Sequence, residues 1–185
     1  MKIKISFSAV LTLAALLLFG RITDVICVLS AAAIHETGHS VAAKLLGVSF
    51  SSLCLDPLGA RLNTTENLVS YKREALLALG GPLANIISLA FSAPLAVLTG
   101  SEFFVVFSYA SAGLAILNLL PIETFDGGRI FYCITHSYRF SRIVSFLCLF
   151  AIFCASLYLL LRTGGALSVF IFSTSLFVRL FLVQK

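Results

Sequence analysis

Long apolar runs separated by short polar breaks make up most of the chain. A bilayer core about 30 Å thick needs about 20 helical residues to cross it. Six runs approach or exceed that length, and we interpret them as spans: Ile5–Gly20, Ile22–Leu46, Leu76–Leu98, Phe103–Leu120, Ile143–Leu161 and Ala166–Val183. The pattern predicts an all-α polytopic membrane protein with six transmembrane helices, folded as a single membrane-embedded domain over residues 1–185.

Composition and charge agree with this interpretation. Hydrophobic residues make up 59% of the chain and charged residues 11%, which excludes both a soluble globular protein and a disordered one. The net charge of +5 contains no run of four basic residues, so we expect no nucleic-acid partner. If the N-terminus is cytoplasmic, only Arg21 and Arg162 among the Lys and Arg residues face outside. The positive-inside rule therefore predicts a multi-pass protein of the cell membrane with both termini in the cytoplasm.

The segment Gly47–Lys72, between the second and third spans, is semi-polar. Apolar and polar residues alternate on both sides of Asp56-Pro57, a pair typical of turns. We expect a short membrane-associated β-hairpin here, after the second helix. A second segment too long for a simple turn is Pro121–Arg142.

Three ionisable residues lie together in the second span, in the string His35-Glu36-Thr37-Gly38-His39. Such groups are costly inside a membrane and usually mark function. Positions i and i+4 share one face of a helix, so both imidazoles can reach one metal ion, and Glu36 lies beside them without having to bind it. His39 comes five residues before Lys44, which places the site about 7–8 Å from the cytoplasmic end of the span.

Two histidines leave a tetrahedral metal site incomplete. The remaining candidates for a third ligand are Asp24, Asp56, Glu123, Asp126 and His136. Asp24 lies at the opposite membrane face and is excluded. Asp126 is favoured because Pro121 ends the fourth span and Gly127-Gly128 would let the backbone turn back beside the carboxylate. Glu123 and His136 could serve as well, although solvated loop groups are the simpler interpretation of both.

The third span contains the string Gly80-Gly81-Pro82-Leu83-Ala84-Asn85. The two glycines would let a neighbouring helix come close, and Pro82 would kink the span. The amide of Asn85 needs a partner in hydrocarbon. It could serve in helix packing or line the site.

Three strings in this order, HETGH, GGPLAN and NLLPIETFDGG, resemble the motifs of the site-2 protease family of intramembrane zinc metalloproteases. The layout is most similar to the compact sporulation-type branch, without a PDZ or CBS domain. The resemblance covers a catalytic core of about residues 22–130, with accessory helices at 1–20 and 143–183. One departure is Phe125, where leucine is common before the aspartate.

The resemblance implies a role for each matching residue. His35, His39 and Asp126 would bind one Zn²⁺ per chain, Glu36 would be the general base, and Asn118 would help to hold the substrate or the oxyanion. We add Asn85, Leu55 and Pro121 as candidate substrate contacts. Leu55 is included because the hairpin Ser52–Leu62 could accept an extended substrate as an added strand.

The expected function is zinc-dependent hydrolysis of peptide bonds in membrane-embedded or membrane-associated substrates near the cytoplasmic face, for regulated intramembrane proteolysis. The expected partners are a membrane-tethered protein substrate and a membrane regulatory partner. Two alternatives are a membrane metal transporter and a non-catalytic relative that binds membrane helices. A transporter should carry polar residues along several spans, whereas the last two predicted spans hold few at depth.

Overall fold

The computed structural model describes residues 2–5, 21–48, 50–56, 59–64, 70–163 and 167–182. The chain forms two compact units, Met1–Leu119 and Leu120–Lys185. The boundary between them falls inside the predicted catalytic core of about residues 22–130. The predicted single domain therefore stays a prediction, and each unit is described by itself.

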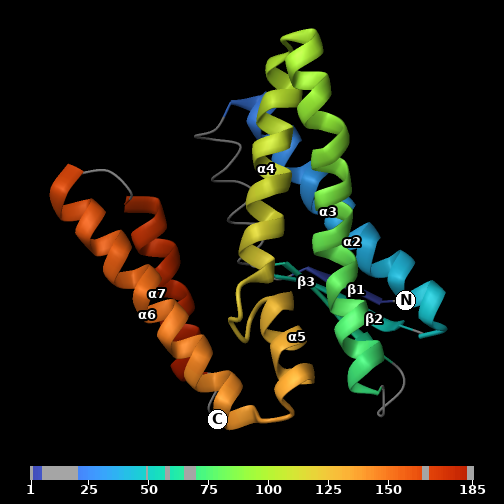
Figure 1. Ribbon diagram of the computed structural model, residues 1–185, viewed down its shortest axis with the longest axis vertical. Helices are drawn as coiled ribbons and strands as arrows, with labels where there is room; N and C mark the ends of the chain where they lie inside the picture. The colour runs from blue at the N-terminus through green and yellow to red at the C-terminus, as the bar shows by residue number, and fades with distance from the viewer. Residues whose placement is uncertain are drawn as a thin grey trace. The chain divides into compact units, whose positions relative to one another are not determined.

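Three long helices form the core of the first unit: α2 (Ile22–Leu46), α3 (Tyr71–Thr99) and α4 (Glu102–Leu119), each packed against the other two (Figure 1). Gly47 and Gly100 follow α2 and α3 with φ angles of 67° and 64°, in the left-handed region where glycine is favoured. The Ser70 hydroxyl caps α3 by accepting the Arg73 N–H at 3.4 Å. α3 continues as one helix through Pro82 and Pro94.

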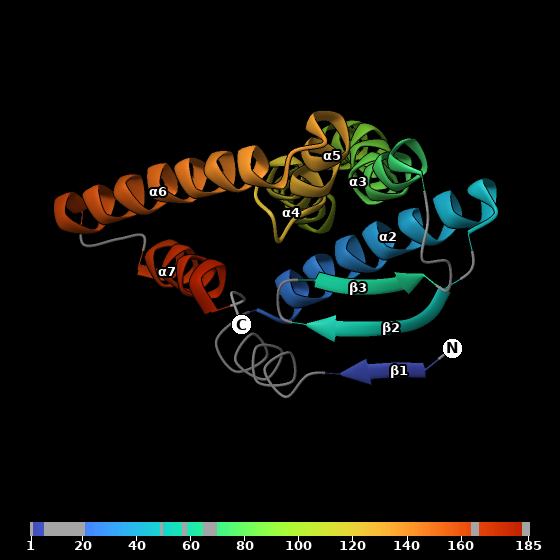
Figure 2. The same cartoon turned by 90° about the horizontal axis from the view of Figure 1, so that it is seen from below.

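A small sheet completes the first unit. β2 (Phe50–Asp56) and β3 (Gly59–Thr64) pair antiparallel in the segment where the sequence predicts a hairpin. β1 (Lys2–Ile5) pairs parallel with β2, so the order is β1-β2-β3 with β2 in the middle (Figure 2). Pro57 and Leu58, in the predicted turn, lie outside the described residues.

The third strand corrects two sequence-based expectations. Ile5, predicted to begin the first span, belongs to a strand rather than to a helix. Leu55 pairs with Ile5 on one side and Ala60 on the other, so β2 cannot accept a further strand. The outer strands of the sheet are β1 and β3. The alternation Lys-Ile-Lys-Ile is too short to predict a strand by itself, because its partner β2 is about fifty residues away in the sequence.

The second unit contains α5 (Asp126–Thr135), α6 (Tyr138–Thr163) and α7 (Leu167–Leu182). Phe153 lies against Phe177 with ring centroids 5.9 Å apart. The Ser156 and Ser173 hydroxyls are 3.1 Å apart between the same two helices. α5 falls within the segment that the sequence analysis left without regular structure.

Four helices of the described residues, α2, α3, α4 and α6, are long and apolar enough to cross a membrane, so the chain is a multi-pass membrane protein. α7 covers most of the predicted sixth span but has 16 residues, about 24 Å of helix. The first predicted span lies, apart from Ile5, outside the described residues. The number of six transmembrane helices therefore stays a prediction.

Candidate metal centre

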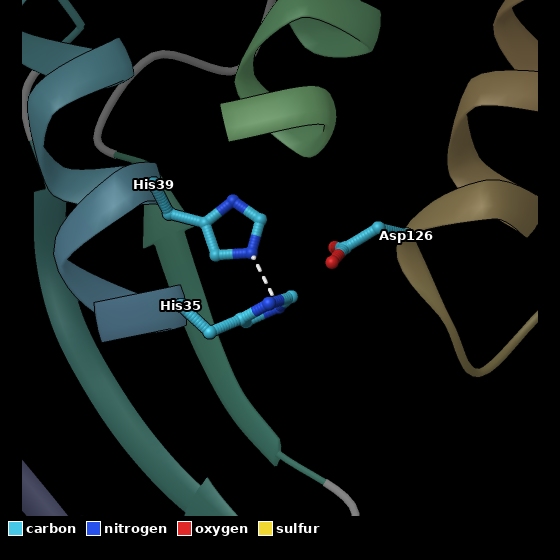
Figure 3. Close-up of side chains that lie close together, drawn as sticks. All are labelled: His35, His39 and Asp126. Carbon is cyan, nitrogen blue, oxygen red and sulfur yellow. Dashed lines mark hydrogen bonds between the residues drawn. The ribbon is translucent and has the colours of Figure 1, made fainter. Parts of the chain in front are cut away.

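His35 and His39 lie one helical turn apart on α2, on one face, as their spacing predicts. Each side chain is 6% exposed. Their Nε2 atoms face each other at 3.2 Å, and the ring planes are nearly perpendicular, at 82° (Figure 3). Both imidazoles are thus buried with the same ring nitrogen directed to one place.

The Nδ1 atoms of the two rings contact α3. His39 Nδ1 lies 2.9 Å from the Leu77 carbonyl oxygen. Because a carbonyl only accepts, this nitrogen carries the proton and the Nε2 of a neutral His39 carries a lone pair. His35 Nδ1 lies 3.2 Å from Asn85 Nδ2. The rings are therefore oriented by the neighbouring helix, as is usual for metal-binding histidines.

Glycines explain how α3 comes so close. A Cβ on Gly38 would collide with the Gly80 carbonyl and lie 2.6 Å from the Ala84 Cβ, and a Cβ on Gly80 would lie 2.7 Å from the Ala42 Cβ. Gly38/Ala42 and Gly80/Ala84 thus form two matching pairs of small residues four positions apart, the spacing that lets membrane helices touch. The prediction of a close approach at Gly80 is confirmed. Gly38 was not predicted to take part in this contact, although its spacing of four residues from Ala42 was a readable signal.

Gly81 leaves room beside the histidines. A Cβ at this position would lie 2.6 Å from His35 Nε2 and closer still to His39 Nε2. Two nitrogens bound to a tetrahedral zinc ion at 2.0–2.1 Å stand about 3.3 Å apart, and the observed separation of the two Nε2 atoms is 3.2 Å. The donor pair, its spacing and the glycine beside it therefore fit a zinc ion.

Glu36 lies in α2, and Asn118 lies near the end of α4. Glu36 is half-buried and follows His35 directly. Asn118 Nδ2 donates to the Leu114 carbonyl oxygen at 3.0 Å, on its own helix. Its amide is thus engaged with backbone, and its role toward substrate stays a prediction. Leu55 lies in β2, and its side chain is outside the described residues.

In the second unit, Asp126 is the first residue of α5, and its side chain is 9% exposed. The amino end of a helix carries a partial positive charge that stabilises an ionised carboxylate. A buried carboxylate held at a helix start is a suitable oxygen ligand for a divalent cation.

The predicted reason for placing Asp126 is wrong. Gly127 and Gly128 lie in the first turn of α5, and the positive-φ glycines of the described residues are Gly47 and Gly100. The benefit of Gly128 is close packing. A Cβ there would collide with the Ile122 carbonyl and lie 2.8 Å from the Glu123 Cα. The glycine therefore lets α5 start directly against the preceding turn.

Ser145 of α6 fixes that turn. Its hydroxyl donates to the Pro121 carbonyl at 3.1 Å and accepts the Glu123 N–H at 3.0 Å. Ser145 is fully buried. The sequence analysis missed it, because a serine in an apolar run looks like any small packing residue.

The competing third ligands have other positions. Glu123 is exposed and accepts the Tyr138 hydroxyl at 3.2 Å. His136 is exposed and caps the end of α5 with φ 52°. Asp24 lies in the first turn of α2, 39 − 24 = 15 residues or about 22 Å along the helix from His39. Asp56 lies in β2, with its side chain outside the described residues.

Comparison with known proteins gives two similarities. The chain is 28% identical over 120 residues to stage IV sporulation protein FB of Bacillus subtilis (strain 168), a match that covers 63% of this chain and 41% of the relative. Its fold is similar to that of the site-2 protease from Methanocaldococcus jannaschii, with a TM-score of 0.69, 21% identity, and coverage of 99% of this chain and 90% of that one. No family model matches the chain. The curated relative and the shared fold support the resemblance to the site-2 protease family that the three motifs carry.

Proposed function

We propose that the protein is a zinc-dependent endopeptidase. It hydrolyses peptide bonds of membrane-embedded or membrane-associated substrates near the cytoplasmic face, for regulated intramembrane proteolysis. The observation that carries the proposal is the buried His35–His39 pair, whose Nε2 atoms have the spacing of two zinc ligands. Such a pair inside a membrane-spanning helix is costly unless a cation or a reaction uses it.

The proposed ligands of one Zn²⁺ per chain are His35, His39 and Asp126. Support comes from each unit by itself: the two buried imidazoles of the first unit direct Nε2 to one place, and the second unit holds a buried carboxylate at the start of α5. Two imidazole nitrogens and one carboxylate oxygen form a set typical of catalytic zinc, with one coordination position left for the reaction.

When bound, zinc supplies Lewis-acid chemistry, because it lowers the pKa of water and polarises the scissile carbonyl. Glu36 is the proposed general base. It takes a proton from the attacking water and delivers it to the nitrogen of the leaving amine, so that its own charge is restored. Asn118, once it releases the Leu114 carbonyl, and the neighbouring Pro121 are the proposed substrate contacts at the end of α4.

A helical substrate hides its carbonyls in hydrogen bonds, so the cleaved stretch must become extended before hydrolysis. We place the proposed strand addition at β1 or β3, because β2 is paired on both edges. The cytoplasmic orientation of the site is supported by basic residues, since Lys44 lies in the last turn of α2 and Lys72 and Arg73 lie in the first turn of its antiparallel neighbour α3.

The test uses three variants of the purified full chain in nanodiscs, with a single-span protein as substrate. Glu36→Gln is expected to keep zinc and lose cleavage at least about 100-fold, the scale of general-base catalysis. His35→Ala and Asp126→Asn should lose zinc and cleavage together. Zinc content is measured by elemental analysis and cleavage by gel.

Two results would end the proposal. Cleavage that survives His35→Ala would remove the metal from the reaction. Histidine-dependent zinc flux into vesicles, without cleavage, would favour a transporter instead.

A further inference from the structure

We propose that Asn85 is the positioning residue of His35. With metal bound, its side-chain oxygen accepts the His35 Nδ1–H and thereby keeps the Nε2 lone pair available to the metal. This inference rests on the proposed zinc site. It assigns to Asn85 a role other than the substrate contact expected from the sequence.

The amide of Asn85 has one partner where it could have more. The side chain is completely buried in α3, with Nδ2 3.2 Å from His35 Nδ1. Oδ1 is buried and has no hydrogen-bond partner among the residues that the structure describes. A buried carbonyl oxygen without a donor is rare and requires an explanation.

The positions of the protons on the two imidazole rings explain why Asn85 Oδ1 has no donor. The Leu77 carbonyl fixes a proton of His39 on Nδ1, so the Nε2 of the neutral ring can only accept. The 3.2 Å contact between the two Nε2 atoms then requires the His35 proton to be on Nε2. His35 Nδ1 is left with a lone pair, which accepts from Asn85 Nδ2. With both rings neutral, these three contacts form a consistent hydrogen-bonded state in which a proton lies between the two Nε2 atoms.

A cation between the same two nitrogens changes the count. Both Nε2 atoms must then present lone pairs, so His35 loses the proton on Nε2 and carries one on Nδ1, and the ring stays neutral. The Nδ1–H would now face the Nδ2 donor of Asn85. A half-turn of the carboxamide exchanges Nδ2 and Oδ1 with almost no change of shape. The turn pairs Nδ1–H with Oδ1, and the orphaned oxygen gains its donor.

Asn85 therefore matches each state of His35 with one or the other end of its amide. The Leu77 carbonyl can accept from His39 in both states without moving, because that ring carries its proton on Nδ1 with or without the metal. A group that hydrogen-bonds the far nitrogen of a metal-binding histidine is worth 10- to 100-fold in metal affinity. An aliphatic side chain at position 85 offers His35 Nδ1 neither a hydrogen-bond donor nor an acceptor.

The experiment measures zinc affinity of the full chain in nanodiscs by competition with a chelator. Asn85→Leu is expected to weaken zinc binding about 10- to 100-fold. Asn85→Asp should stay within a few-fold of wild type, because both carboxylate oxygens accept from Nδ1–H. Ser92→Ala is the matched control. It removes a buried polar group from the same helix, one that contacts Ser108 rather than a histidine, and should leave zinc affinity unchanged.

Two results overturn the inference: wild-type affinity in Asn85→Leu, or an equal loss in Asn85→Asp and Asn85→Leu. A wild-type chain that binds no zinc ends the proposed function instead, so the two failures are distinguishable. Nitrogen-15 NMR of histidine-labelled wild type tests the tautomer even if a variant fails to fold. The His35 proton should be on Nε2 without zinc and on Nδ1 with it, and an unprotonated Nδ1 in the loaded protein overturns the inference.

Discussion

α3 buries polar side chains at two helix crossings, and the crossings differ in kind. Against α4 it presents hydroxyls, with Ser92 2.7 Å from Ser108 and Ser88 3.2 Å from Ser111. Against α2 it presents the Asn85 amide and the Leu77 carbonyl to two imidazoles. Both crossings lie between helices apolar enough to span a membrane.

The serine crossing is complete without any other molecule. A hydroxyl both donates and accepts, and a serine in a helix can also bond the preceding turn, as Ser108 does with the Phe104 carbonyl at 2.7 Å. The histidine crossing directs two ring nitrogens at each other and leaves Asn85 Oδ1 without a donor from the described part of the chain. Buried polar groups that satisfy one another hold helices together, whereas a set that is completed by a cation indicates a site.

The largest expected effect comes from filling the space beside the histidines. In Gly81→Ala the new methyl would contact both Nε2 atoms. Because these are the ends of side chains, the helices can stay in place while the imidazoles turn away from each other. Zinc affinity should fall at least about 100-fold, beyond the loss of a hydrogen-bond partner of a metal-binding histidine, and cleavage should fall with it. Chelator competition and the cleavage assay measure the two effects.

Gly113→Ala in α4 is the control for that change. A Cβ there meets no atom of the described residues within 4 Å, and alanine favours a helix over glycine by about 1 kcal/mol. The control should keep zinc and be at least as stable as wild type. Equal zinc affinity in the Gly81 and Gly113 variants would contradict the proposed position of the metal.

The next effect comes from separating the two helices of the histidine crossing. In Gly38→Ala the methyl would collide with the Gly80 carbonyl, which is backbone and cannot rotate away. Overpacking of this kind costs about 1–3 kcal/mol in unfolding free energy. Because the Leu77 and Asn85 partners lie on the displaced helix, zinc affinity should decrease as well. Unfolding in mixed micelles and chelator competition should both show losses, and a stability loss with unchanged affinity would show that the rings do not depend on α3.

The histidine pair could be predicted from the sequence because its signal is local. His35 and His39 need only the helical period and the cost of charge in a membrane. Asp126 was favoured for a turn at Gly127-Gly128 that does not exist. α5 was not predicted because two adjacent glycines argue against a helix. The packing of Gly128 against Ile122 is visible only in three dimensions.

Other features could not be predicted, because they depend on partners distant in the sequence. β1 exists through its pairing with β2, and a pattern of four residues carries no such information. Asn85 was recognised as needing a partner, but the choice between packing and the site required the 3.2 Å contact with His35. Helical periodicity and the free-energy cost of polar groups in a membrane thus indicate which residues have a function, and tertiary contacts indicate what that function is.

A smaller effect is expected at the serine crossing. A double-mutant cycle of Ser92→Ala and Ser108→Ala should give a coupling near 0.6 kcal/mol and below about 1.7 kcal/mol, the range for hydrogen bonds between membrane helices. Zinc affinity should stay at the wild-type value in all three variants. A loss of zinc in the single variants would mean that the two crossings of α3 are coupled, and the distinction between packing and site would fail.

The smallest effect is expected at the ends of two helices, where Arg21, just before α2, and Glu102, the first residue of α4, form an ion pair with both side chains mostly exposed. The hydrogen bond and charge of Glu102 raise the pKa of Arg21 above its ordinary value. A cation with a raised pKa keeps this stabilisation below its ordinary pKa as long as its carboxylate partner is charged, so the contribution should be constant across neutral pH. Exposed pairs contribute little and are screened by salt, whose Debye length falls to about 3 Å at 1 M. Glu102→Gln should therefore lower the thermal midpoint by less than Ser92→Ala does, and the difference from wild type should vanish at 1 M salt.

Arg21 precedes His35 by 35 − 21 = 14 residues, about 21 Å of helix, so zinc affinity should not change in Glu102→Gln. A shift that persists in high salt, or a change in zinc affinity, would mean that this end of the helices is coupled to the histidine crossing.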